Sequence, residues 1–167
     1  MLPWVNPSPN MRNINQALLY PGIGLLETTN VSVGRGTDAP FELFGAPWID
    51  AVQLVSELQR YHLPGIEFTA RSFTPDSSKH QDEVCHGFHA AITDRQALQS
   101  VRTGLAIAVA LKKLYPQDWD TGNLNRLLCD QAICDAIISG DDLARIEAMF
   151  QDERQTFLQR RLGFLLY

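Results

Sequence analysis

The sequence predicts an α+β fold in which a small antiparallel sheet packs against several helices and follows a loop-rich N-terminal segment. Residues 66–73 alternate apolar and polar side chains, which is the period of a half-buried strand. Residues 85–93 form a second such run, which we expect to pair with the first. Apolar residues at helical spacing dominate residues 98–115 and much of the chain after them. Strands followed by a run of helices are typical of the α+β class.

The N-terminal end reads as a linker. Residues 1–13 are rich in Pro and Asn, so we expect a linker-like lead-in there and a single α+β domain over residues 14–167. Asn13 is expected to cap a short helix, and Pro21-Gly22 is expected to end it. Residues 41–44 look extended.

The remaining helices are predicted from apolar spacing and from capping residues. Pro116 and Gly140 are expected stop signals, and Asp141-Asp142 are expected to cap the last helix. The apolar tail 164–167 is expected to dock on the domain. The predicted helices cover residues 50–62, 98–115, 120–128, 132–138 and 142 to about 161.

Composition narrows the possible partners. The chain has 167 residues, 45% of them hydrophobic and 20% charged, and its net charge is −5 with a pI near 5.3. Because no basic cluster exists, nucleic acid is not an expected partner. No apolar run is long enough for a membrane span, and the first residues do not form a signal peptide. These observations leave the compartment open.

Residues 27–48 combine the features of a binding loop for a polar ring. Gly34 and Gly36 flank Arg35 and free the backbone to display it. Hydroxyl and amide side chains surround the arginine, aromatic residues follow it, and aromatic faces suit the apolar side of a sugar ring. The alternative is a structural loop, in which Arg35 pairs with Glu42 or Asp38 and the aromatic residues enter the core.

Two further cations are candidates for binding an anion. Lys79 lies in the polar loop between the predicted strands, and Arg102 stands near the start of the longest helix, where backbone N–H groups favour anions. The alternative for Arg102 is a pair with Asp94 or a neighbouring acid.

No catalytic residue, metal ligand or cofactor is assigned from spacing. His80, His86 and His89 are close in sequence but lack a third ligand at a metal-binding spacing. Cys85 beside a histidine is a conceivable nucleophile without a supporting signature. The carboxylates nearest to the Arg35 loop are Glu27, Glu42 and Asp50. Sequence spacing does not show whether any two of them face each other across a bond. Three cysteines without a paired pattern are more typical of small buried side chains.

Distinctive short runs extend over most of the chain: Pro7-Ser8-Pro9-Asn10, Ala17-Leu18-Leu19-Tyr20-Pro21-Gly22, Glu27, Thr29-Asn30-Val31-Ser32, Gly34-Arg35-Gly36-Thr37, Pro40-Phe41-Glu42, Gly45-Ala46-Pro47-Trp48, Phe73-Thr74-Pro75, Lys79, Cys85, Gly87, Thr93-Asp94, Arg102-Thr103-Gly104-Leu105 and Leu165-Leu166-Tyr167. In these runs the chain resembles the exo-β-N-acetylmuramidase family, formerly domain of unknown function 1343 and now glycoside hydrolase family 171.

The resemblance implies a bipartite enzyme that releases N-acetylmuramic acid from peptidoglycan fragments during cell-wall turnover, in the cell envelope or outside the cell. In that family a Rossmann-like N-terminal domain carries the proposed catalytic glutamate, and a smaller C-terminal domain closes the cleft. This chain resembles only the C-terminal domain, so activity of the chain alone stays open. The implied partners are a muropeptide or another sugar containing N-acetylmuramic acid, and an N-terminal catalytic domain.

The resemblance and the residues converge on the Arg35 loop. A guanidinium can hold the lactyl carboxylate of N-acetylmuramic acid, and an aromatic ring can stack on the pyranose. The expected substrate-binding residues are Glu27, Asn30, Arg35, Gly36, Thr37, Phe41, Trp48 and Arg102. Two alternatives are a stand-alone module that binds cell-wall sugars or a protein, and a small hydrolase that uses Glu27, Glu42 or Cys85.

Overall fold

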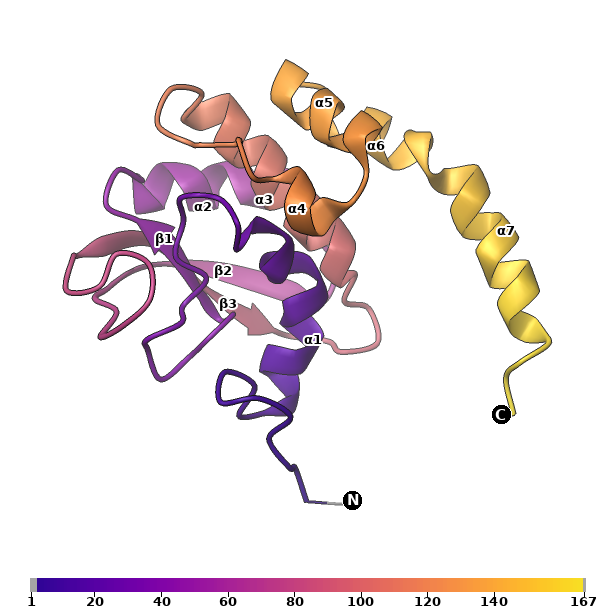
Figure 1. Cartoon of the computed structure of the whole chain (residues 1–167), viewed down its shortest axis with the longest axis horizontal. Helices are drawn as coiled ribbons and strands as arrows, with labels where there is room; N and C mark the ends of the chain where they lie inside the picture. The colour runs from indigo at the N-terminus through magenta and orange to yellow at the C-terminus, as the bar shows by residue number, and fades with distance from the viewer. Residues whose placement is uncertain (1–2, 167) are drawn as a thin grey trace.

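The computed structural model describes residues 3–166 and confirms the α+β class. Figure 1 shows how the strands and helices follow one another along the chain. The elements are α1 (Ile14–Ile23), the 3₁₀ turn η1 (Gly24–Leu26), β1 (Leu43–Ala46), α2 (Ala51–Gln59), β2 (Ile66–Phe73), β3 (Cys85–Ile92), α3 (Ser100–Leu114), α4 (Asn125–Leu128), α5 (Gln131–Ser139), α6 (Leu143–Met149) and α7 (Gln151–Leu162).

The sheet is antiparallel, with the strand order β1-β3-β2. The two predicted strands pair along their length, from Ile66 opposite Ile92 to Phe73 opposite Cys85. The third strand, β1, pairs with the other edge of β3. Sequence reasoning expected only extended backbone near this strand, because four residues are too few to show a period of two.

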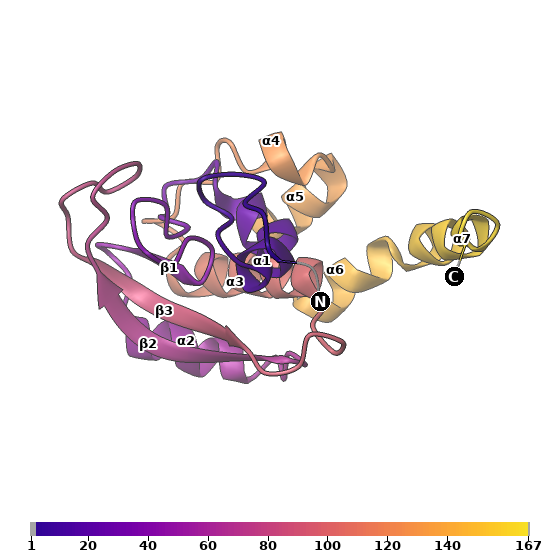
Figure 2. The same ribbon diagram turned by 90° about the horizontal axis from the view of Figure 1, so that it is seen from below.

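Helix α3 runs through the centre of the molecule. Its residues Thr103–Leu111 are all buried, so the helix is apolar almost all round, as a helix enclosed in a core must be. Figure 2 shows α1 and α3 between the sheet on one side and α4 and α5 on the other. None of the helices within residues 3–166 has the length and apolar character needed to cross a membrane.

Helix α1 continues through Pro21, so the prediction that Pro21-Gly22 ends it is wrong. Gly22 lies where α1 crosses α3, and a Cβ atom at this position would stand 1.8 Å from the Ser100 carbonyl oxygen. The close crossing with α3 holds the last turn of α1 in place, and tertiary packing of this kind outweighs the local cost of a proline.

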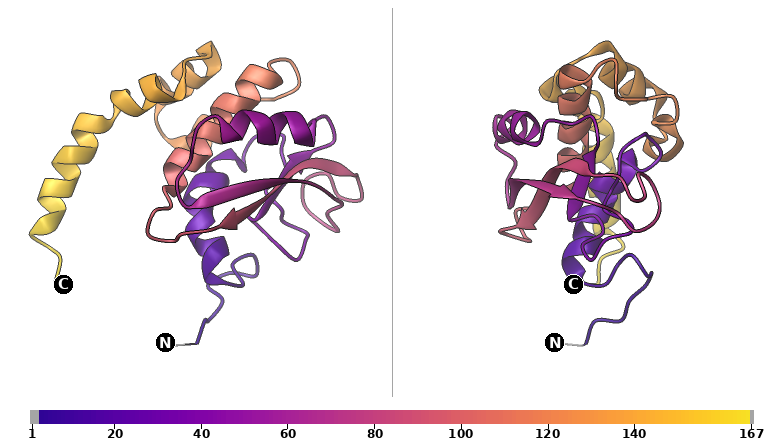
Figure 3. Two further views of the ribbon diagram at one scale, coloured as in Figure 1. Left: turned by 180° about the vertical axis from the view of Figure 1, so that it is seen from behind. Right: turned by 90° about the vertical axis from the view of Figure 1, so that its left-hand side faces the viewer.

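The predicted last helix is two helices. The break is at Phe150, whose backbone (φ −115°, ψ 8°) is not helical, and α7 leaves the body there without burying a residue. Figure 3 shows α7 projecting away from the other elements. The expectation of a docked tail also differs from the structure, because Phe164 and Leu166 are 80% and 94% exposed. Met1, Leu2 and Tyr167 lie outside the described residues, so the boundaries of the lead-in 1–13 and the domain 14–167 stay predictions.

Candidate functional site

Arg35 pairs with Glu27 rather than with either of the acids expected from sequence. Its Nε lies 2.5 Å from Glu27 Oε1, and its Nη2 donates a hydrogen bond of 3.1 Å to Glu27 Oε2. The two side chains are 30% and 27% exposed, so the pair lies at the surface and not inside the core. The guanidinium stands 5.4 Å from the centre of the Phe41 ring, a cation–π distance that further fixes its orientation.

Two glycines shape the loop that carries Arg35. Gly34 and Gly36 both have positive φ (80° and 77°), which favours glycine. A Cβ atom on Gly36 would lie 2.3 Å from the Ser77 carbonyl oxygen. The 74–84 loop therefore packs directly on the Arg35 loop, and Asp76 N donates to Gly36 O at 2.8 Å.

Lys79, from the 74–84 loop, contacts Glu27 of the Arg35–Glu27 ion pair. Its Nζ donates to the backbone oxygen of Glu27 at 2.5 Å. Burial lowers the pKa of Lys79 below its usual value, although the charges of Glu27 and Asp120 act in the opposite direction. Next to it, the His80 ring contacts the Asn30 carbonyl at 2.9 Å. Of the two cations proposed from sequence, Lys79 is the one that the fold brings to the Arg35 loop.

A surface hollow of about 500 Å³ opens beside these charges. We call it the Glu27 hollow; its lining consists of Tyr20, Glu27, Thr28, Lys79, Asn123, Arg126 and Leu127. Tyr20 is 38% exposed and meets the Phe41 ring edge-on at 5.0 Å. Sequence reasoning missed Tyr20 and Arg126, because no local pattern connects α1 or α4 with the Arg35 loop.

Most hydrogen-bonding side chains of the Arg35 loop are used within the fold. The Asn30 amide donates to the Asp118 carbonyl and accepts from the Asp120 N–H, both at 2.8 Å. Thr37 Oγ1 donates to Gly34 O at 2.6 Å. These residues therefore hold the loop and its neighbours in place. Gly36 and Thr37 also line a second hollow of about 390 Å³, next to the N-terminal lead-in.

The aromatic residues of this segment lie mainly inside the protein. Phe41 and Phe44 are fully buried, and Phe44 stacks on Phe88 with ring centres 5.1 Å apart. Trp48 is half-buried and meets Tyr115 edge-on at 5.4 Å. Phe41 thus supports Arg35 from beneath, and the aromatic ring that reaches the hollow is that of Tyr20.

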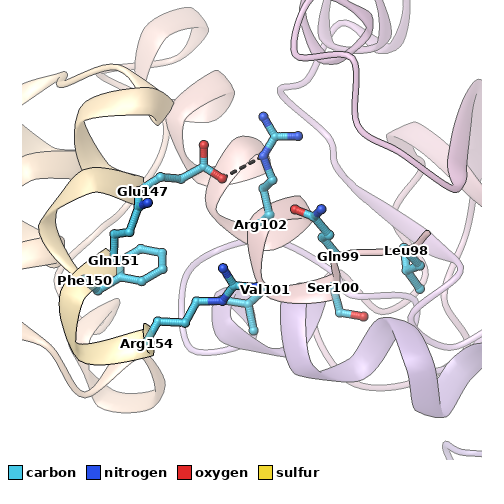
Figure 4. Close-up of a pocket in the computed structure, with 9 residues that line it drawn as sticks. All are labelled: Leu98, Gln99, Ser100, Val101, Arg102, Glu147, Phe150, Gln151 and Arg154. Carbon is cyan, nitrogen blue, oxygen red and sulfur yellow. Dashed lines mark hydrogen bonds and ion pairs between the residues drawn. The ribbon is translucent and has the colours of Figure 1, made fainter. Parts of the chain in front are cut away.

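Arg102 lies in a different place from the Arg35 loop. It forms an ion pair of 2.6 Å with Glu147, so the sequence alternative of an acidic partner applies, with a partner from α6. Figure 4 shows the pair bridging α3 and α6 at the edge of a groove of about 640 Å³. The groove contains none of residues 27–48, so the fold does not bring Arg102 to the Glu27 hollow.

The alternative chemistries find little support in the geometry. Cys85 is fully buried, and burial raises the pKa of its thiol to about 11, which is contrary to what a nucleophile needs. His86 contacts Ser72 Oγ at 2.8 Å instead of the thiol. Glu42 is held by Asn13 at 3.1 Å and by His89 at 3.7 Å. Within residues 3–166, no three His, Cys, Asp or Glu side chains gather where they would hold a metal ion.

Comparisons with known proteins agree with the resemblance seen in the sequence. The family model for the C-terminal part of exo-β-N-acetylmuramidase NamZ matches residues 18–167. The chain is 41% identical over 169 residues to the peptidoglycan β-N-acetylmuramidase NamZ of Bacillus subtilis strain 168. This match covers 99% of the chain but 41% of the B. subtilis protein.

Two crystal structures from Bacteroides fragilis have the same fold. Both are of proteins from the family named DUF1343, at TM-scores of 0.73 and 0.71 and sequence identities of 24% and 25%. The matches cover 99% and 96% of this chain, and 46% and 43% of the B. fragilis chains. The chain therefore spans less than half the length of the relatives that it matches, and it belongs to the family formed by the C-terminal domain of the exo-β-N-acetylmuramidases.

Proposed function

We propose that this chain is the substrate-recognition domain of a peptidoglycan exo-β-N-acetylmuramidase and that it binds N-acetylmuramic acid at the Glu27 hollow. The observation that carries the proposal is the convergence of Arg35 and Lys79 on Glu27 at the surface. Three segments far apart in the sequence meet there: the Arg35 loop, the 74–84 loop and the start of α4. Surface hollows with a few fixed polar groups are the usual form of small-ligand sites.

The chemistry of the hollow fits a carboxylated amino sugar. Lys79 and the exposed Arg126 supply positive charge for the lactyl carboxylate. Glu27 is held in one orientation by Arg35, so its oxygens can accept from a sugar hydroxyl or an acetamido N–H group. The Tyr20 ring offers an apolar face to the pyranose. Of the substrate-binding residues expected from the sequence, Glu27 alone lines this hollow, and Arg35 is connected to it through its ion pair with Glu27. Sugar contacts by the other expected residues stay predictions: Asn30, Arg35, Gly36, Thr37, Phe41, Trp48 and Arg102.

The catalytic carboxylate is proposed to lie in an N-terminal Rossmann-like domain. The resemblance assigns it to that domain, and no carboxylate within residues 3–166 stands free at the hollow to take its place, since Glu27 is engaged by Arg35. In this proposal the present chain supplies one wall of the cleft and orients the terminal sugar. Hydrolysis then requires both domains, whether in one polypeptide or in two.

The test is a titration followed by ¹H–¹⁵N chemical shifts. N-acetylmuramic acid is expected to shift the amides of residues 27–37 and 79–80, and N-acetylglucosamine, which lacks the lactyl carboxylate, is expected to shift them much less. Equal responses to the two sugars would remove the carboxylate-recognition role. No response at these residues, even after the N-terminal part of the B. subtilis relative is added, would remove the proposal.

A matched pair of variants locates the site. Lys79→Met removes a cation from the hollow and should weaken the binding of N-acetylmuramic acid about tenfold, the effect of losing about 1.4 kcal/mol. Arg145→Gln removes an exposed cation on α6 and should leave binding unchanged. Binding of N-acetylmuramic acid without any association with the N-terminal part would instead favour a stand-alone sugar-binding module.

A further inference from the structure

Helix α7 packs hardly at all on the rest of the chain, as is typical of a helix that contacts a partner. It is a helix of 12 residues with no buried side chain, and it is followed by an exposed apolar tail. An isolated helix of this length is marginal in water, and most of the stability of a helix in a protein comes from packing one of its faces. The body of this chain supplies α7 with little packing beyond α6.

Leu158 and Leu162 lie one turn apart, so they share one face of α7 with Arg154, which stands four residues before Leu158. Leu162 is 62% exposed. Phe157, 51% exposed, lies at the edge of this face, next to Arg160. Leu165 and Leu166 continue the apolar surface beyond the helix, at 45% and 94% exposure.

This face leads into the groove of about 640 Å³ between α3 and α7. In Figure 4 Phe150 and Arg154 line one wall, and Val101 and Arg102 line the other. Val101 is 49% exposed although it belongs to the most buried helix of the molecule. The groove and the α7 face together form one continuous surface, which we call the arm surface (Leu98, Val101, Arg102, Phe150, Arg154, Phe157, Leu158, Leu162, Leu165 and Leu166).

The position of the N-terminus indicates what covers the arm surface. Figure 1 and both panels of Figure 3 place the N-terminal lead-in and the end of α7 on the same side of the molecule. The lead-in also exposes apolar side chains, Trp4 at 40% and Val5 at 80%. In the relatives that this chain matches, more than half of the protein lies outside the match, and the family model is the C-terminal part. A domain that precedes the lead-in would therefore start on the side of the arm surface.

We propose that the arm surface docks on the N-terminal domain of the muramidase, so that α7 clasps a domain that also meets this chain at the lead-in. This inference rests on the proposed function, because it takes the N-terminal domain as the partner. The N-terminal domain presents apolar side chains to Leu158 and Leu162, and an acidic group to Arg154, whose guanidinium has no ion-pair partner within residues 3–166.

The first test is hydrogen exchange on the chain as it stands. Alone and monomeric, it should show fast exchange over residues 151–166, because no tertiary packing protects them. Slow exchange in the monomer would mean that α7 packs on its own body and would overturn the proposal. A dimer in light scattering that Leu162→Glu dissociates would identify a second copy as the occupant and would overturn it too.

The second test adds the N-terminal part of the B. subtilis relative, which is the portion that this chain does not match. Association is expected, with slowed exchange over residues 151–166. Leu158→Glu and Leu162→Glu should each weaken it about tenfold or more, as loss of a central apolar contact does. Thr156→Glu, on the opposite face of α7, is the matched control and should have little effect. Failure to associate, or association without protection of α7, would count against the clasp.

The two proposals fail in different ways. The α7 variants should leave the binding of N-acetylmuramic acid by the chain unchanged, because the arm surface shares no residue with the Glu27 hollow. Sugar binding without any clasp would overturn only the arm proposal. A clasp without sugar binding would overturn only the assignment of the sugar to the Glu27 hollow.

Discussion

Gly22 of α1 and Gly104 of α3 meet backbone to backbone. A Cβ atom on Gly104 would lie 2.3 Å from the carbonyl oxygen of Gly22, far inside van der Waals contact. This contact lets the two helices cross closely and fixes the end of α1, from which η1 leads into the Arg35 loop. The position of the candidate site therefore depends on glycine at both positions, because a side chain at either one would push the helices apart.

The first prediction concerns this crossing. Gly104→Ala should lower the free energy of unfolding by roughly 2 kcal/mol, since a clash of about 3 kcal/mol exceeds the helix-propensity gain of about 1 kcal/mol. Urea denaturation measures the loss. Gly163→Ala is the control, because the nearest atom to its added Cβ is 3.8 Å away and its stability should hardly change. Equal stability of the two variants would show that the crossing is looser than described.

The second prediction concerns the replacement of the Arg35 guanidinium by an ammonium group. Arg35→Lys keeps the charge but loses the planar fork that contacts both oxygens of Glu27. Glu27 is then free to rotate, and N-acetylmuramic acid should bind about tenfold more weakly, a loss of about 1.4 kcal/mol. Calorimetry gives the affinity. The same substitution at Arg145, an exposed residue of α6, should not alter it.

The third prediction is a pH dependence that comes from Glu57. Burial alone raises the pKa of Glu57, but the hydrogen bond and charge of Lys113, with contributions from Tyr61 and Arg60, outweigh burial and hold it below the usual 4.5. A carboxyl with a depressed folded-state pKa stabilises the fold above pH 4.5, and this contribution is lost as the pH falls through the folded-state pKa.

Urea denaturation of the wild type and of Glu57→Gln at neutral and acidic pH measures this effect. The variant should be less stable than the wild type at pH 7 and should lose less stability below pH 4.5. Glu67→Gln, at an exposed position of β2, is the control and should follow the wild type. A variant whose acid sensitivity equals that of the wild type would assign the pH dependence to other carboxyls.

The fourth prediction concerns the three free thiols. Cys129 is exposed, whereas Cys85 and Cys134 are buried, and burial raises the pKa of both buried thiols, that of Cys85 to about 11. At pH 8 a thiol reagent such as Ellman's reagent should therefore react quickly with one thiol of the folded protein. The fast phase should disappear in Cys129→Ser. Fast labelling of Cys85 would revive the nucleophile hypothesis.

Strands and capped helices could be predicted because their signals are local. The strand predicted over residues 66–73 has the same bounds as β2, and Asp50 caps α2 by accepting from the N–H groups of Val52 and Gln53. The continuation of α1 through Pro21 could not be predicted in this way. It depends on the crossing with α3, about 80 residues later in the sequence, where packing outweighs the proline.

The candidate site likewise has features that could be predicted from the sequence and features that could not. The glycine-flanked Arg35 was visible in the sequence, since the positive φ of Gly34 and Gly36 is a local property. The acid that pairs with Arg35 could not be identified from the sequence, because Glu27, Glu42 and Asp38 are all close to it and only the fold selects one. The contact of Lys79 with Glu27 spans 52 residues, a separation that no spacing rule covers. The role of Phe41 as a support under Arg35 likewise requires knowledge of its burial.

The indole of Trp119 is buried, and its Nε1 donates to Thr29 Oγ1 at 3.1 Å, at the start of the loop that carries Arg35. The other tryptophans of the described chain, Trp4 and Trp48, are more exposed to solvent. Trp119 is thus a natural fluorophore that contacts the Arg35 loop through this hydrogen bond. In a variant with Trp4 and Trp48 replaced by phenylalanine, a red shift of its emission would report that the loop has come loose from the α3–α4 connection before the rest of the protein unfolds.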